Sequence, residues 1–251
     1  MLEKESTTPF YLPLKEFLEG GKKIRPALLL LVHDACGGGG EDPHPAAAAV
    51  ELIHAASLIH DDIIDRSDFR RGEISFHVKY GLEMSILIAD FILSLVLGIA
   101  NRYRDRKVGE ILADTAEKMS VGEMLEVQAL RKGREITLDQ YLEILKLKTA
   151  VLFEAASSLG AVISGRHDLV EDMGLYGLYI GMAYQIKDDL LDWGNEGELS
   201  SLLKGDEVKE LLEGIASNLA LEAIDRLKVL QDSPQKDILR DMALFSINRE
   251  K

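Results

Sequence analysis

Residues 51–65 read ELIHAASLIHDDIID, an apolar helical pattern that ends in three aspartates. Asp61 and Asp65 are four positions apart, so on a helix they lie one above the other, about 5–6 Å apart at their β-carbons. Like charges at this spacing repel each other. A solvated acidic helix face normally includes lysines, whereas Leu58 and Ile59 just before this cluster are apolar. Divalent cations are therefore the expected partners of these carboxylates.

The same pattern occurs a second time, as DDLLD at residues 188–192. Carboxylate oxygens without histidine or thiolate partners suit Mg²⁺, which keeps several waters and often bridges one or two carboxylates to substrate phosphates. A single acidic run is as readily explained as exposed surface. Two copies, each ending an apolar helix, favour a diphosphate clamp instead.

Composition limits the class of protein. The 251 residues are 47% hydrophobic, enough for one sizeable core, and we expect a single domain over residues 1–251. The net charge of −14 argues against nucleic acid as a partner. Cys36 is the only cysteine, and no basic-then-apolar signal pattern opens the chain, so a cytoplasmic location is expected.

The longest apolar stretch, Ile86 to Ala100, is interrupted by Asp90 and falls short of the roughly 20 residues needed to cross a bilayer. It is interpreted as a buried helix, so no transmembrane segment is expected.

The periodicity throughout the chain predicts an all-α fold. Apolar residues recur at three- and four-residue spacing, and alternating strand patterns are absent. Thr137 and Gln140 form a capping-box pattern that opens a helix extending to the glycines at Gly160 and Gly165. Breaks are expected at residues 37–45, 67–76, 131–136 and 194–205, and none is long enough for a domain linker.

Two groups of basic residues could bind the anionic part of a second ligand. GGKKIRP at residues 20–26 combines permissive glycines with a basic turn, and Arg70-Arg71-Gly72 follows the first aspartate block. The guanidinium group of arginine suits bidentate phosphate contacts. Either patch alone is more typical of ordinary surface. Together with Lys148-Thr149 in an apolar helix, they outline a pocket with metals on one side and cations on the other.

The ordered set GGKKIRP, ELIHAASLIHDDIID, RRG, LKTA and GMAYQIKDDLLD resembles the trans-type polyprenyl diphosphate synthases, relatives of farnesyl and geranylgeranyl diphosphate synthase. The match extends from about Gly20 to Asp192. This resemblance implies the isoprenoid synthase helical bundle, with the two aspartate blocks facing each other across a central cavity, usually in a homodimer. It also implies an enzyme that condenses isopentenyl diphosphate with an allylic prenyl diphosphate.

The resemblance also implies residue roles. Mg²⁺ ions that bind the allylic diphosphate would be held by Asp61, Asp62, Asp65, Asp188, Asp189 and Asp192. The allylic site would be completed by Arg70, Lys148, Thr149 and Gln185. Isopentenyl diphosphate would be bound by Lys22, Arg25, His54 and Arg71. His54 alone is more typical of a core histidine, and its place seven residues before Asp61 is what favours this role.

These residue types fit the chemistry. Breaking the allylic C–O bond leaves a diphosphate anion and an allylic cation, so metals and cationic side chains must stabilise the leaving group. Asp61, Asp65, Lys148 and Asp188 are the expected catalytic residues, with the aspartates serving as anchors and not as bases. The double bond of isopentenyl diphosphate then attacks the cation, and the released diphosphate takes the proton. Water must be excluded, or it would trap the cation as an alcohol.

Product length is expected to depend on the residues one turn below the first block. Ala56 and Ser57 occupy the fifth and fourth positions before Asp61, where a large aromatic residue in related enzymes would close the floor of the cavity. These small side chains leave the floor open, which predicts a product of geranylgeranyl length or longer.

The segment after Asp192 departs from the family pattern. Family members usually continue into a glycine- and lysine-rich loop, whereas here residues 193–198 read WGNEGE and Lys204 is the nearest candidate for the missing lysine. Three interpretations remain open: a chain-elongating synthase, a terpene synthase-like enzyme of the same fold (including one that joins two prenyl chains), or a non-catalytic or small subunit of a heteromeric synthase.

Overall fold

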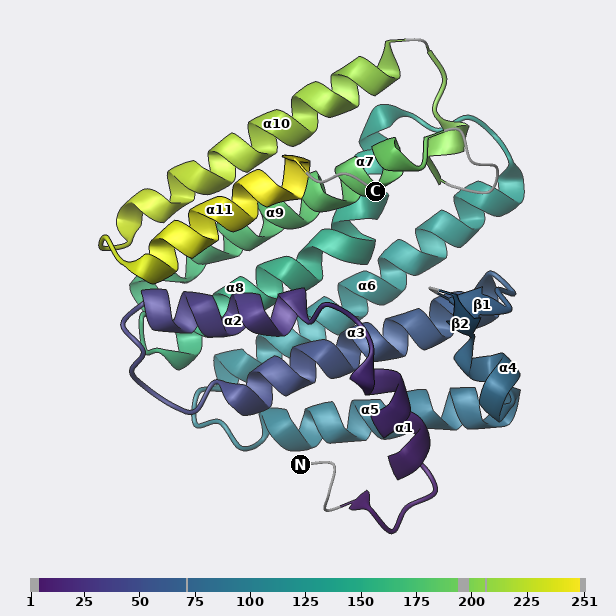
Figure 1. The fold of residues 1–251 in the computed structure, drawn as a ribbon, viewed down its shortest axis with the longest axis horizontal. Helices are drawn as coiled ribbons and strands as arrows, with labels where there is room; N and C mark the ends of the chain where they lie inside the picture. Colours follow the sequence, from purple (N-terminus) through teal and green to yellow (C-terminus); the bar gives the residue numbers. More distant parts are fainter. Residues whose placement is uncertain (1–4, 71, 194–198, 206, 249–251) are drawn as a thin grey trace.

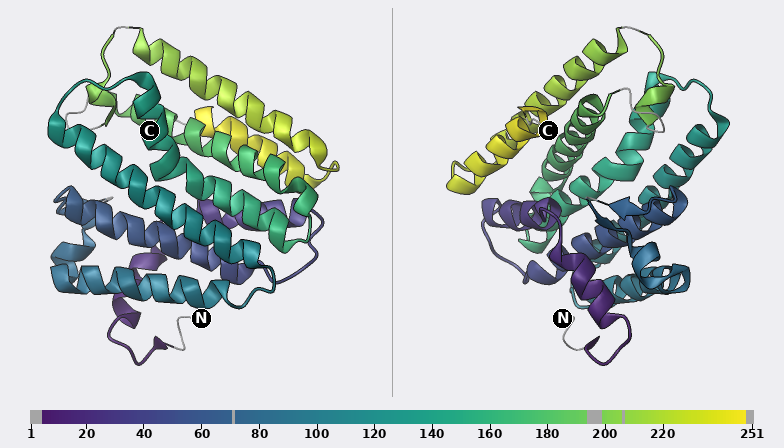
Figure 2. Two further views of the ribbon diagram at one scale, coloured as in Figure 1. Left: turned by 180° about the vertical axis from the view of Figure 1, so that it is seen from behind. Right: turned by 45° about the vertical axis from the view of Figure 1, so that its right-hand side comes forward.

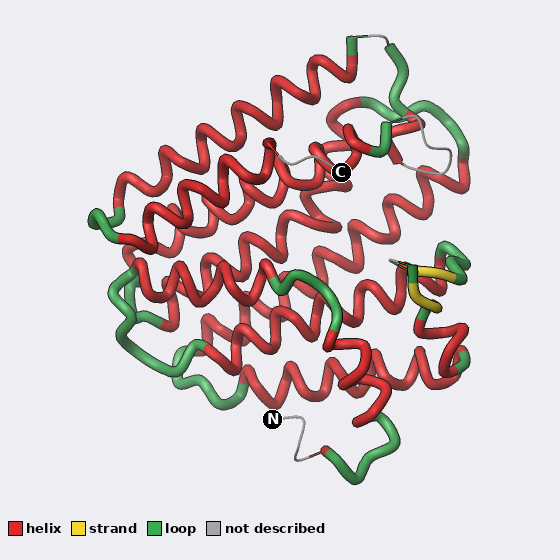
Figure 3. Tube along the Cα trace, viewed as in Figure 1, coloured by secondary structure: helices red, strands yellow, loops and turns green. Residues whose placement is uncertain are grey.

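The computed structural model describes residues 5–70, 72–193, 199–205 and 207–248. These residues are almost entirely helical, which confirms the predicted all-α class (Figure 3). The α-helices are α1 (Tyr11–Glu19), α2 (Ile24–Ala35), α3 (His44–Ile64), α4 (Phe76–Tyr80), α5 (Leu82–Ala100), α6 (Arg106–Lys132), α7 (Leu138–Leu145), α8 (Val151–Ile163), α9 (Val170–Leu191), α10 (Val208–Arg226) and α11 (Pro234–Asn248). The shorter elements are strands β1 (Phe69–Arg70) and β2 (Glu73–Ile74), the π-helical turn η2 (Lys146–Ala150) and the 3₁₀ turns η3 (His167–Leu169), η4 (Leu199–Leu202) and η5 (Leu227–Val229).

Helix α8 lies in the middle of the bundle, between α2, α6 and α9 (Figure 1, Figure 2). All of its residues except Glu154 are buried, as expected for a helix that is apolar on every side. Its neighbours approach closely because glycines face the contacts. A Cβ on Gly160 would lie 2.7 Å from the carbonyl oxygen of Leu29, and one on Gly177 would lie 2.3 Å from that of Phe153.

The predicted helix after Thr137 is present, but it is interrupted by the π-helical turn η2. The capping box is confirmed: Gln140 N–H donates to Thr137 Oγ1 at 3.2 Å, and Thr137 N–H donates to Gln140 Oε1 at 3.0 Å. The turn packs against Gly122 of α6, where a Cβ would lie only 2.5 Å from the backbone nitrogen of Lys148. Single π turns inside α-helices are frequent at functional sites.

A short hairpin follows α3 and lies inside the predicted break at residues 67–76. Its strands pair antiparallel, with Phe69 opposite Ile74 and Arg70 opposite Glu73. Strands of two residues are too short to produce an alternating pattern, so the sequence did not indicate them. The hairpin lies next to the end of α3 (Figure 1), and its Arg70 donates a hydrogen bond to Asp62 of that helix.

The expectation that residues 86–100 form a buried helix is wrong for this chain on its own. Helix α5 buries only one stripe of side chains, and 33% of its most apolar stretch of 18 residues is buried. With 19 residues, this helix is long enough and apolar enough to cross a membrane. Core helices of soluble proteins can have the same length and composition. The exposed apolar side chains on this helix are Leu82, Ile86, Leu87, Leu93 and Leu97.

Three helices bring their C-terminal ends to the same end of the bundle. Helices α3, α6 and α9 all run toward the end where the hairpin lies, on the right in Figure 1. The two aspartate blocks close α3 and α9, so the fold carries both acidic clusters to one end.

Candidate active site

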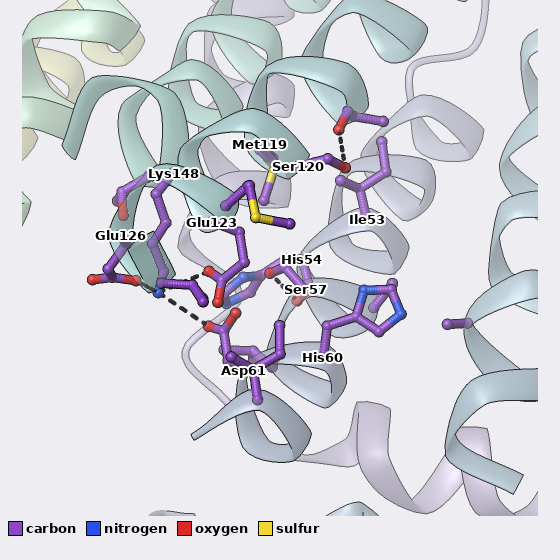
Figure 4. A pocket seen from close by; sticks show the side chains of 18 of the residues that line it. Ile53, His54, Ser57, His60, Asp61, Met119, Ser120, Glu123, Glu126 and Lys148 are labelled. Carbon is purple, nitrogen blue, oxygen red and sulfur yellow. Dashed lines mark hydrogen bonds and ion pairs between the residues drawn. The ribbon is translucent and has the colours of Figure 1, made fainter. Parts of the chain in front are cut away.

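A cavity of about 840 Å³ lies among α3, α5, α6, η2 and α9. Part of its wall is apolar, formed by Ile53, Ile92, Val96 and Met119. The wall also has a polar region, which includes Asp61, Arg70, Glu123, Glu126, Lys148, Gln185 and Asp189. Figure 4 shows Met119 and Ile53 on the side of the cavity away from Asp61 and Lys148. Such a division suits a ligand with an anionic head and a hydrocarbon tail.

The first aspartate block is tied to Arg70. Asp62 points into the protein, with 1% of its side chain exposed, and its Oδ1 accepts a hydrogen bond from Arg70 Nε at 2.6 Å. Its Oδ2 is buried and has no hydrogen-bond partner in the described part of the chain. Asp61 lines the cavity, and Asp65 is exposed at the end of the helix. The structure therefore brings Arg70 and this block together.

Lys148 lies among three carboxylates (Figure 4). Its Nζ is 2.9 Å from Glu123 Oε2 and 4.0 Å from Asp61 Oδ2, and it also donates a hydrogen bond to Glu126. The sequence analysis did not single out Glu123 and Glu126. Their only signal was spacing: three positions apart, they share the inner face of α6 with Met119 and Gly122.

Burial and mutual repulsion shift the protonation equilibria of this cluster. Burial is the main cause that raises the pKa of Asp61 to about 7, opposed by the charge of Lys148 and reinforced by Glu123. Burial also raises the pKa of Glu126. Asp65 is exposed at one side, and its partial loss of contact with water, together with the charge of Glu123, raises its pKa as well. Burial disfavours the charged form of Lys148, but the carboxylates of Glu126, Asp61 and Glu123 outweigh it and raise its pKa. Lys148 is therefore a cation in the free protein.

The cluster has an excess of negative charge that fits a divalent cation. Four carboxylates, those of Asp61, Asp65, Glu123 and Glu126, face the cations Lys148 and Arg70. Glu123 Oε1 is buried without a hydrogen-bond partner in the described chain. Within those described residues, no three acidic, histidine or cysteine side chains converge closely enough to hold a metal ion by themselves.

In the second aspartate block, Asp189 accepts hydrogen bonds from two neutral side chains. Asp189 lines the cavity, and its two carboxylate oxygens accept hydrogen bonds from Tyr141 Oη at 2.6 Å and Gln185 Nε2 at 2.8 Å. Gln185 in turn accepts from Thr149 Oγ1 at 3.3 Å. Asp188 is half-buried and Asp192 exposed, and neither belongs to the cavity wall. The two blocks thus border one cavity through Asp61 and Asp189. Tyr141 is a further residue that the sequence analysis missed.

The residues expected to bind isopentenyl diphosphate are brought together only in part. Arg25 Nη1 and His54 Nε2 are 3.1 Å apart, and both residues line the cavity. Because a guanidinium group can only donate, His54 Nε2 is the acceptor in this hydrogen bond. The Arg25 guanidinium also lies 4.5 Å from the ring centre of Phe153. Lys22 is exposed in the turn before α2 and outside the cavity wall, while Arg71 lies outside the described residues.

One turn below Asp61, the residues that line the cavity have small side chains. Ala56 and Ser57 both belong to its wall, and Ser57 Oγ donates to the backbone carbonyl of His54 at 2.9 Å. That bond satisfies the Ser57 hydroxyl within its own helix, so the hydroxyl is not an unpaired polar group in the cavity wall beside Ala56.

Residues 8–243 match the family described as polyprenyl synthetase. The chain belongs to the polyprenyl synthetase family. It is 31% identical to the geranylgeranyl diphosphate synthase of Methanosarcina mazei, over 92% of this chain and 86% of that protein. It is 36% identical to the octaprenyl diphosphate synthase of Escherichia coli, over 76% of this chain but only 59% of that protein. Members of this family are prenyltransferases.

Solved polyprenyl synthetase structures share the fold. A decaprenyl diphosphate synthase from Rhodobacter capsulatus superposes with a TM-score of 0.86 at 28% identity, covering 96% of this chain and 90% of that one. A polyprenyl synthase from Caulobacter crescentus, solved in complex with calcium and isoprenyl diphosphate, has a TM-score of 0.84 at 26% identity, covering 97% and 90%. The isoprenoid synthase helical bundle expected from the sequence is confirmed.

One departure from the polyprenyl synthetase pattern stays untested. Residues 194–198, in the unusual segment after Asp192, lie outside the described residues. Lys204, the candidate for the missing lysine, is exposed and does not belong to the cavity wall.

Proposed function

We propose that this protein is a chain-elongating trans-prenyltransferase, which condenses isopentenyl diphosphate with an allylic prenyl diphosphate. The single observation that carries this proposal is the cavity itself. Asp61 and Asp189, one from each aspartate block, line the cavity together with Lys148. Another part of the lining is apolar and includes Ile53. The aspartate blocks serve the diphosphate head, and the apolar wall receives the growing prenyl tail.

Mg²⁺ is the proposed cofactor, held by Asp61, Asp62, Asp65, Asp188, Asp189 and Asp192. When bound, it supplies positive charge that stabilises the diphosphate leaving group. The raised pKa of Asp61, about 7, and the buried unpartnered Oδ2 of Asp62 support a cation site at the first block, because each is relieved by nearby positive charge.

The other groups at the polar end are proposed to bind the allylic diphosphate. Lys148 remains protonated and can turn from the carboxylates of Glu123 and Glu126 to a phosphate oxygen. Arg70 is anchored on Asp62, which holds its guanidinium at the rim of the same cavity. Thr149 and Gln185 complete this side with neutral donors.

Isopentenyl diphosphate is proposed to bind beside the allylic head group, through Lys22, Arg25, His54 and Arg71. Arg25 is held between His54 and the ring of Phe153, so its guanidinium is oriented before substrate arrives. This arrangement would hold the double bond of isopentenyl diphosphate toward the carbon that loses diphosphate. The chain would also keep water from the cation, since the wall beyond Asp61 is apolar.

The product is proposed to be geranylgeranyl diphosphate or longer. Ala56 and Ser57 contribute little volume to the cavity wall, and a cavity of about 840 Å³ leaves room for a long tail. Exposed apolar side chains support a homodimer: Leu93 on α5 and Met124 on α6 are 51% and 56% exposed and also line the cavity. A second copy over this face would bury apolar surface and close the cavity to water. A cytoplasmic location remains a prediction from the single cysteine.

The test is to incubate the purified protein with Mg²⁺, radiolabelled isopentenyl diphosphate and each allylic primer in turn, and to identify products by mass spectrometry. Elongated prenyl diphosphates are the expected result, and a chelator should abolish them. Products formed from an allylic diphosphate alone would replace this proposal with a terpene synthase-like activity. Turnover that appears only after another chain is added would identify a subunit of a heteromeric synthase.

A further inference from the structure

Tyr141 lies on α7 against the second aspartate block, and its side chain is fully buried. Its Oη is 2.6 Å from Asp189 Oδ2. Burial, together with the negative charge of Asp189, raises the pKa of Tyr141, so the hydroxyl keeps its proton and donates it in this bond. The capping box formed by Thr137 and Gln140 fixes the first turn of the same helix. The hydroxyl is therefore held at one place relative to Asp189.

Asp189 is fixed at both of its carboxylate oxygens. Tyr141 occupies Oδ2, and Gln185 Nε2 donates to Oδ1 at 2.8 Å from one turn earlier on α9. Gln185 accepts from Thr149 on η2, so the network joins α7, η2 and α9 where α9 ends. Asp189 and Gln185 line the cavity, whereas Tyr141 does not. The direct link from the Tyr141 hydroxyl to the cavity is its hydrogen bond to Asp189.

We propose that Tyr141 is a positioning residue of the diphosphate site, acting through the carboxylate of Asp189. This inference rests on the proposed function, in which Asp189 serves a Mg²⁺–diphosphate complex. Hydrogen-bond donors behind a metal-binding carboxylate fix its orientation, and their removal typically weakens metal binding by about 10- to 100-fold. The phenol ring fills core space that phenylalanine could fill equally well. The hydroxyl is the part of the side chain that the site requires.

Tyr141→Phe tests this role, with Tyr176→Phe as the matched control. Tyr176 is also fully buried, and its Oη donates to the backbone carbonyl of Leu239 at 2.7 Å, away from the cavity. Both substitutions remove one buried phenolic hydroxyl, so both should lower the thermal unfolding temperature. Calorimetric titration with Mg²⁺ in the presence of inorganic diphosphate should show about tenfold weaker binding for Tyr141→Phe. The control should bind as the unmodified protein does.

A double-mutant cycle shows whether Tyr141 works through Asp189. In an Asp189→Ala background, Tyr141→Phe should cause no further loss of Mg²⁺–diphosphate affinity. The Mg²⁺ concentration for half-maximal turnover should follow the same pattern across the four proteins. Independent, multiplying effects of the two substitutions would overturn the proposal, and so would equal behaviour of Tyr141→Phe and Tyr176→Phe.

These outcomes are distinct from failure of the proposed function. If the unmodified protein binds Mg²⁺–diphosphate through Tyr141 and Asp189 but elongates no primer, the positioning role stands and the synthase proposal fails. If it elongates primers while Tyr141→Phe matches its control, the synthase proposal stands and the positioning role fails. An unmodified protein that binds no Mg²⁺–diphosphate contradicts both.

Discussion

The two aspartate blocks share one sequence pattern but lie in different surroundings. The first is surrounded by charges: Arg70 binds Asp62, and Lys148 lies between Asp61, Glu123 and Glu126. In the second, both carboxylate oxygens of Asp189 accept hydrogen bonds from neutral groups, Tyr141 and Gln185. Two copies of one pattern therefore acquire different electrostatics from their surroundings: β1, α6 and Lys148 of η2 supply charged groups to the first, and α7 supplies a tyrosine hydroxyl to the second.

This difference suggests a division of labour. A buried carboxylate cluster with a lysine among it can exchange partners when a charged ligand arrives, because its charges are incompletely balanced. A carboxylate fixed at both oxygens by neutral donors is already oriented and has less to rearrange. We therefore regard the first block as the part of the site that rearranges when a charged ligand binds, and Asp189 of the second block as a carboxylate already oriented for binding.

The largest expected effect is on turnover when either block loses an aspartate. Asp61→Ala should lower kcat by about 10²-fold or more, because charge on the leaving group is then poorly stabilised. Asp188→Ala should cause a loss of similar size. Steady-state assays with isopentenyl diphosphate and an allylic primer measure both. Near-normal turnover of either variant would contradict the assignment of that block.

At the first block, the substitution that lowers turnover should not lower folding stability. The raised pKa of Asp61 means that its charged form is disfavoured in the folded protein, so Asp61→Ala should leave the free energy of unfolding unchanged or increase it at pH 8. Urea denaturation measures this free energy. A large loss of stability would show that Asp61 supports the fold and not the ligand.

The pH dependence of stability should report on the first block. The pKa of Asp61 is about 7 in the folded protein against an ordinary value of 3.8, so its contribution to stability is fully present below about pH 4 and is lost as the pH rises through 7. Mg²⁺ with inorganic diphosphate should offset this loss, raising the unfolding temperature at pH 8 by about 5 °C and at pH 5 by much less. Differential scanning calorimetry at both pH values tests this.

Asp61→Asn is the control for this prediction. It removes the titrating carboxyl group at nearly constant volume, so this variant should lose less stability between pH 4 and pH 7 than the unmodified protein does. An unchanged profile for Asp61→Asn would mean that other groups, such as Glu126, cause the pH dependence.

The strongest predictions from sequence concerned features with a local signature. The three- and four-residue periodicity predicted the helical class, and Thr137 and Gln140 marked a helix start. The assignment of Arg25 and His54 to one site came from the resemblance to polyprenyl diphosphate synthases, and the two side chains do lie 3.1 Å apart although they are on different helices. The roles of Glu123 and Glu126 depended on which face of α6 packs on η2. A glutamate three positions from another is ordinary on any exposed helix, so local pattern could not distinguish them.

Long-range partners account for the other omissions. Tyr141 and Asp189 are 48 positions apart, and nothing in the residues around Tyr141 distinguishes it from a core tyrosine. The exposure of α5 was missed for a related reason: composition shows that a helix is apolar but not whether each of its faces finds a partner within the same chain. Predictions failed where packing between distant segments decides the outcome.

A smaller effect is expected where α3 lines the cavity below the first block. Ala56→Phe should shift the product distribution toward shorter chains, because the aromatic ring would occupy the path of the tail. Ala56→Ser is the control, since it adds little volume and should leave the products unchanged. Ala183, at the equivalent place before the second block, is fully buried outside the cavity wall, so the two blocks also differ in this respect. Identical products from the two Ala56 variants would contradict the role of this position.

The smallest effect is expected at the edge of the neutral network. Thr149 Oγ1 donates to Gln185 at 3.3 Å, a long hydrogen bond, so Thr149→Val should raise the KM for the allylic diphosphate only about threefold and leave kcat unchanged. Thr115→Val is the matched control: its hydroxyl donates to the Ile111 carbonyl at 2.7 Å, and Thr115 lies outside the cavity wall. The control should lose some stability without any change in KM. A tenfold fall in kcat for Thr149→Val would mean that this hydroxyl stabilises the departing diphosphate and not only its binding, and that the second block is not the passive support that its neutral partners suggest.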